Sequence, residues 1–187
     1  GVINVLTKDA RYTRGGLVEL SGGTQERGAA TVRFGGRLAE GAHYRVYAKH
    51  FDRCETESVD GDGLGDDWHV SRVGARAEWA RSDVDLLTLQ GELYQGELGE
   101  PLKIITSLTE PFVETFVDAV DLGGGHLLGR WKRRLGAAGE LGLQVYYDRS
   151  NRQGRAIEGL TQTLDAELQH RFSAGARHAV VWGAGGR

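Results

Sequence analysis

Eight basic side chains recur at alternate positions of apolar segments and are the residues best suited to bind a ligand. They are Arg45, Lys49, Arg53, Arg72, Arg76, Arg130, Lys132 and Arg134. Guanidinium and ammonium groups donate strong, charge-assisted hydrogen bonds, so together they could bind a small anionic ligand or a metal chelate. The carboxylates interleaved with them are Glu78, Glu92, Asp148, Asp165 and Glu167. For any single basic residue, we expect pairing with such a neighbour more often than ligand binding.

Other residue patterns argue against catalysis and metal binding. An acidic loop resembles a calcium loop in composition but lacks EF-hand spacing; its carboxylates are Glu55, Glu57, Asp60, Asp62, Asp66 and Asp67. The six histidines are scattered without ligand-pair spacing. No nucleophile elbow, phosphate loop or catalytic serine–histidine set is present. We therefore expect no enzyme, no metal and no cofactor. A net charge of −3 gives no reason to expect a nucleic-acid partner, and the single Cys54 excludes an internal disulfide.

A two-faced hairpin over residues 126–149 shows which elements position the basic residues. In its second arm, alternate apolar residues run from Leu141 to Tyr147, opposite a polar set that runs from Gly142 to Asp148. Successive strand side chains point to opposite faces, so the alternation predicts a β-hairpin with one apolar and one polar face. Each arm has about 10 residues, the length with which a tilted strand crosses a bilayer.

The same alternation recurs along the chain and predicts an all-β antiparallel meander of about nine long strands, forming part of a transmembrane β-barrel. The predicted strands cover residues 14–24, 29–38, 43–53, 68–81, 86–95, 126–135, 141–149, 160–172 and 178–187. We expect long irregular segments at 54–67, 96–122 and 150–159 to alternate strictly with short turns, as in outer-membrane barrels. Within the second segment, residues 113–120 could form a short helix or an extra strand.

The polar face should line the barrel interior. An Arg or Lys that faces lipid near the bilayer midplane costs about 2–4 kcal/mol, so eight of them on the lipid side would be prohibitive. Arg133 falls on the apolar side but near a strand end, where it can snorkel. Trp79, Trp131 and other aromatics fall near strand ends, as an interfacial girdle requires. The parity of Phe51 does not fit such a girdle.

The opening residues 1–8, Gly-Val-Ile-Asn-Val-Leu-Thr-Lys, resemble the strand that ends the plug domain of TonB-dependent outer-membrane receptors. The resemblance implies that residues 1–10 are the last plug strand and that residues 11–187 are the N-terminal portion of the barrel. It also implies a location in the bacterial outer membrane and contact with outer-membrane lipid. The implied activity is import of a scarce nutrient such as a ferric siderophore. The implied partners are an energy-coupling TonB-type protein, reached through the plug, and a small anionic or metal-chelate ligand.

The sequence departs from that family in ways that predict a fragment. The body of the plug, its energy-coupling box and a closing aromatic-terminated strand are missing, and about nine strands fall below the roughly 22 of plugged transporters. An alternative is a passive outer-membrane pore or an adhesion-type barrel without energy coupling. Two further alternatives are an outer-membrane enzyme with a site on its external loops and a soluble β-sandwich. The identity of the cargo is not encoded in these residues.

Overall fold

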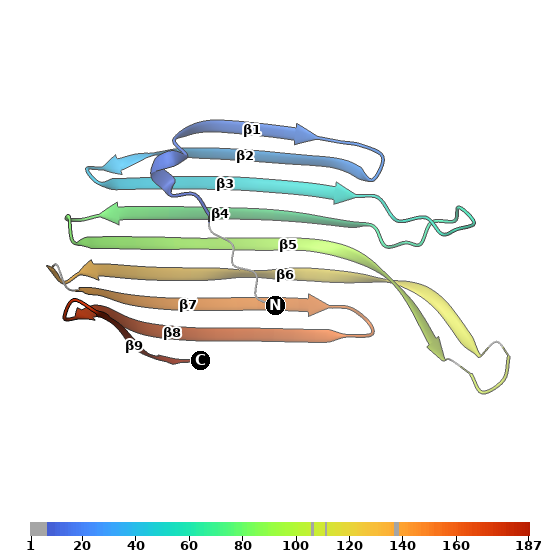
Figure 1. The fold of residues 1–187 in the computed structure, drawn as a ribbon. Helices are drawn as coiled ribbons and strands as arrows, with labels where there is room; N and C mark the ends of the chain where they lie inside the picture. The colour runs from blue at the N-terminus through green and yellow to red at the C-terminus, as the bar shows by residue number, and fades with distance from the viewer. Residues whose placement is uncertain (1–6, 106, 111, 137–138) are drawn as a thin grey trace.

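The computed structural model describes residues 7–105, 107–110, 112–136 and 139–187. It contains one antiparallel sheet of nine strands that lie side by side in chain order (Figure 1). A 3₁₀ turn, η1 (Ala10–Tyr12), precedes them. The strands are β1 (Gly15–Ser21), β2 (Glu26–Ala39), β3 (Ala42–Arg53), β4 (Trp68–Ala80), β5 (Asp85–Ile105), β6 (Val113–Arg134), β7 (Gly139–Gln153), β8 (Glu158–Ala174) and β9 (His178–Gly186). The prediction of an all-β antiparallel meander of nine strands is confirmed.

One rim of the sheet is built entirely from short turns. Glycines with left-handed backbone occur in three of these turns: Gly41 with φ 68°, Gly136 with φ 79° and Gly175 with φ 69°. Tight hairpin turns need such positive φ values, which only glycine adopts without a steric cost. At Gly41 an added Cβ would also lie 2.4 Å from the Ala80 carbonyl oxygen of the neighbouring strand. These turns fix the register of the hairpins.

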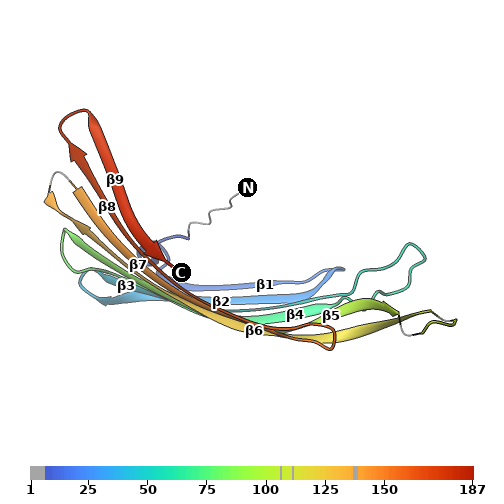
Figure 2. The same ribbon diagram turned by 90° about the horizontal axis from the view of Figure 1, so that it is seen from below.

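Cross-strand pairing separates the side chains into a polar and an apolar face. One continuous row joins Arg33, Tyr47, Gly74, Glu92 and His126 across five strands. The adjacent positions form rows of the opposite face, which is apolar across most of the sheet. The sheet is curved (Figure 2), and the N-terminal segment with η1 lies on its concave side. Since η1 contacts polar-face residues of β3 and β4, the concave face is the polar one.

The apolar convex face has no protein layer over it. Val18, Val73, Leu89 and Leu127 are each more than half exposed. The buried apolar residues of the described chain are only Ala10, Ala42, Val70 and Val120. A single sheet with both faces open has no core of its own, and apolar surface on this scale is typical of a protein that contacts a partner or a membrane. None of the described residues forms a helix long and apolar enough to cross a membrane.

The prediction that residues 96–122 are irregular is wrong, because most of them lie in strands β5 and β6. β5 and β6 continue to pair from Asp85↔Arg133 to Ile105↔Val113 and form a hairpin that projects beyond the other strands (Figure 1). Pro101 is accommodated because pairing of β5 with β4 ends at Leu98, so β5 is an edge strand beyond that residue. Of the two structures considered for residues 113–120, a strand is the correct one.

The projecting β5–β6 hairpin contacts the turn between β7 and β8. The Asp118 carboxylate, only 2% exposed, accepts hydrogen bonds from the backbone amides of Arg155 at 2.7 Å and Ala156 at 3.3 Å. The guanidinium of Arg155 lies 5.1 Å from the centre of the Phe116 ring. Asp118 therefore fastens two connections of the same rim together.

The prediction of a long loop over residues 150–159 is also wrong. β7 and β8 pair as far as Gln153↔Glu158 and leave only a short turn between them. The connection between β1 and β2 on that rim is short as well. Long and short connections therefore do not alternate strictly. The long loop after β3 is present, and the projecting β5–β6 hairpin is the other large feature of that rim.

The expected plug strand over residues 1–10 lies largely outside the described residues. The described part, Thr7–Asp9, is not in a strand, and it leads directly into η1.

Candidate functional site

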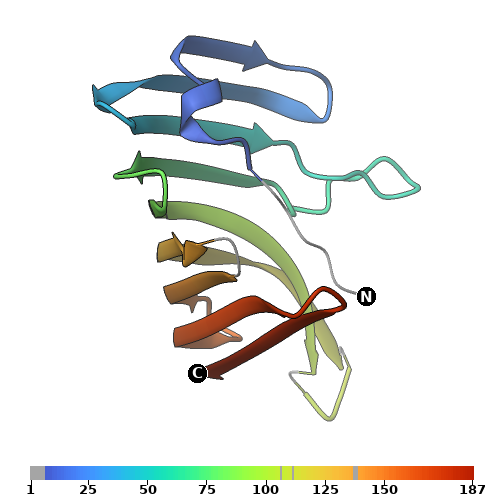
Figure 3. The ribbon, with the colours of Figure 1, turned by 60° about the vertical axis from the view of Figure 1, so that its left-hand side comes forward.

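The concave face carries the N-terminal segment across β2, β3 and β4 (Figure 3). The Ala10 amide donates to Glu78 Oε2 at 2.9 Å, and Arg45 Nη1 donates to the Lys8 carbonyl oxygen at 2.9 Å. Arg76 donates from Nη1 to Thr7 Oγ1 at 3.1 Å. These bonds fix the path of the chain before it enters the first strand.

Arg76 and Glu78 form the anchor of that segment. They lie two positions apart on the same face of β4, so their side chains meet directly. The Arg76 Nε and Nη2 atoms lie 2.6 Å and 2.5 Å from Glu78 Oε1, and the two side chains are only 15% and 11% exposed. Arg45 and Arg76 face each other directly across the β3–β4 pair. The hydrogen bonds to Glu78 and the N-terminal segment offset the repulsion between these two cations.

A polar hollow of ≈ 770 Å³ opens beside η1, towards the short-turn rim. It brings together four of the predicted basic residues, Arg76, Arg130, Lys132 and Arg134. Arg130 donates from Nε and Nη2 to Gln144 Oε1 at 3.0 Å and 2.5 Å. The hollow is lined by both charge signs and can accept a polar, anionic group.

Residues at the short-turn rim hold Lys132 and Arg134, two of the predicted basic residues in that hollow. Lys132 Nζ lies 3.7 Å from Glu140 Oε1. Arg134 donates to the backbone carbonyl oxygen of Asp83. Lys132 is therefore paired, as expected for most of the basic residues, whereas Arg134 supports the neighbouring turn.

Three other predicted residues gather near the opposite rim. Lys49, Arg53 and Arg72 surround the ring of Phe51 on the concave face. Trp68 packs edge-on against Phe51, with ring centroids 4.8 Å apart. The eight predicted residues therefore form two separate groups, with Arg45 between them beneath the N-terminal segment.

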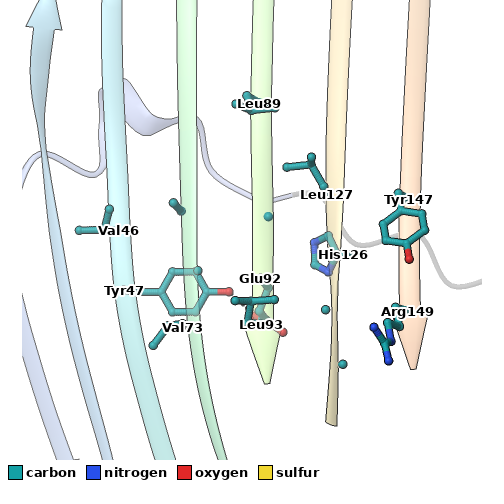
Figure 4. Close-up of a pocket in the computed structure, with 15 residues that line it drawn as sticks. Val46, Tyr47, Val73, Leu89, Glu92, Leu93, His126, Leu127, Tyr147 and Arg149 are labelled. Atoms are coloured by element: carbon teal, nitrogen blue, oxygen red, sulfur yellow. Dashed lines mark hydrogen bonds between the residues drawn. The ribbon is translucent and has the colours of Figure 1, made fainter. Parts of the chain in front are cut away.

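Tyr47 and Glu92 connect the strands between the two groups, and the sequence analysis did not identify them as a pair. Tyr47 reaches from β3 across β4 towards Glu92 on β5 (Figure 4), and its hydroxyl donates to Glu92 Oε2. Gly74 lies beneath the ring, where an added Cβ would be 2.5 Å from Tyr47 Cε1. Arg72 Nη1 lies 3.7 Å from Glu92 Oε1. Alternation places all four residues on one face, but the contact of Tyr47 with Glu92 across Gly74 depends on the strand register.

Behind this cluster, the convex face carries a groove of ≈ 830 Å³ over the small residues Ala75, Gly91 and Gly125 (Figure 4). Leu89 and Leu127 are among the apolar side chains that border it. The small residues create the groove because they leave space between larger neighbours on adjacent strands. Its lining is almost entirely apolar, so it suits an acyl chain or another hydrocarbon surface.

The acidic loop between β3 and β4 is held by internal hydrogen bonds. Asp66 accepts from the Thr56 hydroxyl at 2.7 Å and the Thr56 amide at 2.6 Å. The hydroxyl bond first and the amide bond second lower the pKa of the Asp66 carboxyl. Within the described ranges, no group of three or more His, Cys, Asp or Glu residues could hold a metal ion.

Charge pairing accounts for about half of the predicted basic residues. Four of the eight lie within 4 Å of a carboxylate; these are Arg53, Arg72, Arg76 and Lys132. Of the interleaved acidic residues, Asp165 pairs with Arg187 at 3.3 Å, and Asp148 accepts a hydrogen bond from Tyr146 at 3.2 Å. On the apolar side, Arg133 lies 3.9 Å from Asp85 at the short-turn rim. The concave face is therefore a charged, partly paired wall.

Comparison with known proteins gives no match to a family model, a curated protein or a solved structure.

Proposed function

We propose that the chain is part of an outer-membrane β-barrel receptor that imports a scarce, anionic nutrient such as a metal chelate by energy coupling. The convex face supports a membrane location. Its apolar rows run over seven residues of β5, from Leu87 to Leu93, which is about 24 Å along the strand. At a tilt of 35–45° this gives a band of roughly 17–20 Å, somewhat below the ≈ 25 Å of outer-membrane barrels. Trp79 and Trp131 mark its edge at the short-turn rim.

The polar concave face supports the assignment of an interior. The convex side contains few charges near its centre, whereas the concave side carries cations over its whole length, among them Arg72, Arg76 and Lys132. A charged interior and an apolar exterior are what a water-filled barrel in a bilayer requires, because lipid cannot solvate ionic groups. The open edges at β1 and β9 are compatible with a sheet that continues in further strands.

The observation that carries the receptor proposal is the N-terminal segment on the concave face. Passage of solutes through a passive pore does not require residues before the first strand to cross the interior wall, whereas a domain inside the barrel does. Here Thr7, Lys8 and Ala10 are held there by Arg76, Arg45 and Glu78. This placement suits a linker from a domain inside the barrel. It also accounts for the Arg76–Glu78 pair, which is among the least exposed ion pairs of the sheet.

Membrane fractionation and cross-linking in the native host test this proposal without knowledge of the cargo. We expect the protein in the outer-membrane fraction, and a cross-link to a TonB-type protein that is lost when the gene for that protein is deleted. Recovery in the soluble fraction would refute the membrane location. An outer-membrane location without any cross-link would favour a passive pore or an adhesion-type barrel. We propose no enzymatic activity for this receptor and no metal or cofactor of its own.

A further inference from the structure

We infer that the cluster around Phe51 is a binding site for a small anion that carries a flat aromatic ring. The cluster comprises Lys49, Phe51, Arg53, Trp68 and Arg72. It lies on the concave face, near the rim that carries the acidic loop between β3 and β4. The inference rests on the proposed function, because it takes the concave face as the wall that meets the cargo, and it adds the chemical class of that cargo.

Three cations converge on one aromatic ring. Lys49 Nζ lies 5.7 Å from the centre of the Phe51 ring, and the Arg53 and Arg72 Cζ atoms each lie 5.9 Å from it. Arg53 is also 5.2 Å from the centre of the Trp68 ring. One cation over an aromatic face is a common stabilising contact. Three around a single phenylalanine concentrate positive charge beyond what that ring can stabilise.

The register adds a second unfavourable feature. Lys49 and Arg72 are direct cross-strand partners on the same face. Like charges in that position repel and destabilise the sheet. A structural wall would gain stability from a carboxylate at either position. The presence of two cations there is explained if a ligand supplies the missing negative charge.

The carboxylates nearby only partly compensate. Glu26 lies 3.9 Å from Arg53 Nη2, and Glu92 lies 3.7 Å from Arg72 Nη1, both at the outer limit of an ion pair. Within the part of the chain that the structure describes, Lys49 has no ion-pair partner. The buried Nε atom of Arg72 also has no hydrogen-bond partner there. A buried donor without a partner is costly, and an anion at this site could accept from it.

The aromatic residues decide which anion fits best. Phe51 and Trp68 lie directly against each other with rings at 88°, so one of the two can present a face to a flat ligand while the other supports it from the edge. Aromatic pairs of this geometry are attractive beyond the burial of apolar area, so a flat aromatic ligand can join the pair. A ring with acidic substituents would use the aromatic residues and the cations together. A saturated acid of the same charge would use the cations alone.

Calorimetric titration of the detergent-purified protein with two monoanions tests this inference. The probes are 2-naphthoate and decahydro-2-naphthoate, which share a carboxylate and the same fused-ring carbon skeleton but differ in aromaticity. We expect 2-naphthoate to bind at least about tenfold more tightly, a ratio that corresponds to 1.4 kcal/mol. Equal affinity for the two acids, or binding of neither, would overturn the inference.

Variants separate the two parts of the site. Phe51→Leu should remove most of the preference for the aromatic acid, whereas Lys49→Gln should weaken both acids by a similar factor of about tenfold. Arg177→Gln, in an exposed turn at the opposite rim, removes one positive charge without touching the cluster and should leave both affinities unchanged. Circular dichroism and the melting temperature check that each variant is folded. An unchanged preference in folded Phe51→Leu would refute the role of the ring.

These titrations use no energy source and no partner protein. Failure to detect any TonB-type cross-link in the native host would therefore refute the proposed function while leaving a measured aromatic preference in place. Conversely, a cross-linked outer-membrane protein that shows no aromatic preference would refute only the site.

Discussion

Replacement of Asp118 by alanine should release the projecting β5–β6 hairpin from the β7–β8 turn. The carboxylate is nearly inaccessible and accepts from two backbone amides of that turn, at 2.7 Å and 3.3 Å. Alanine removes Asp118 Oδ2, the one oxygen that accepts both bonds, and leaves the amides of Arg155 and Ala156 without that partner. The strands on either side keep their ladder bonds, so we expect a local opening of the rim and an intact sheet.

The size of the effect follows from those two bonds. A hydrogen bond to a charged group contributes about 1.5–3 kcal/mol to stability. The shorter bond, to the Arg155 amide, should contribute its full free energy. The longer bond, to the Ala156 amide, is near the distance limit of a hydrogen bond and should contribute little. Removal of a buried carboxylate also removes its desolvation cost, so we expect a net loss of about 2 kcal/mol. At 1.4 kcal/mol per factor of ten, the open population of the turn should rise about 30-fold.

Limited trypsin digestion measures this opening, because Arg155 lies in the turn itself. We expect the initial rate of cleavage after Arg155, followed by mass spectrometry, to rise about 30-fold in Asp118→Ala, when opening is fast relative to cleavage. Asp118→Asn keeps a neutral acceptor and should give a smaller rise. Asp121→Ala, an exposed position on the same strand, is the matched control. An unchanged rate in Asp118→Ala, or an equal rise in Asp121→Ala, would refute the reasoning.

Three further outcomes test the faces, the packing and the acidic loop. Leu89→Arg, on the convex face, should destabilise the protein in lipid vesicles by about 2–4 kcal/mol, measured by urea unfolding, whereas Gln169→Arg on the concave face, between Gly142 and Gly183 of the neighbouring strands, should cost far less; similar losses would contradict the assignment of the two faces. Gly74→Val should displace the Tyr47 ring and destabilise the protein by about 1–3 kcal/mol, and the same change in a Tyr47→Ala background should cost clearly less; additive effects would show that the ring is not what restricts residue 74. The folded-state pKa of Asp66 is lowered, so its bonds should order the loop above the ordinary carboxyl pKa of about 3.9 and be lost as the pH falls through the lowered folded-state pKa; the Thr56 amide resonance should follow this transition in the wild type but not in Asp66→Asn.

The alternation of apolar and polar residues is enough to predict the strands and the face on which each residue lies. Arg133 illustrates this: its parity places it on the apolar side near a turn, and the structure pairs it with Asp85 at that rim. The prediction succeeds because side-chain direction in a strand has a period of two, a local property of the backbone. Proline and aperiodic polar residues are weaker guides, which is why the segment from Gly96 to Leu122 was wrongly predicted to be irregular. Its pairing depends on a partner strand that tolerates Pro101 at an edge.

The candidate site, like the fold, could be predicted from the sequence only in part. Residue types and parity identified Lys49 and Arg72 as polar-face cations and placed Phe51 on that face, outside any girdle. They could not show that all three meet, because contact between strands depends on register, and register is set by turns such as the one at Gly41. The sequence by itself therefore determined an all-β chain with two chemically distinct faces. Only the tertiary structure decided which charges are paired and which remain available, because strand pairing and sheet curvature bring side chains together that are distant along the chain.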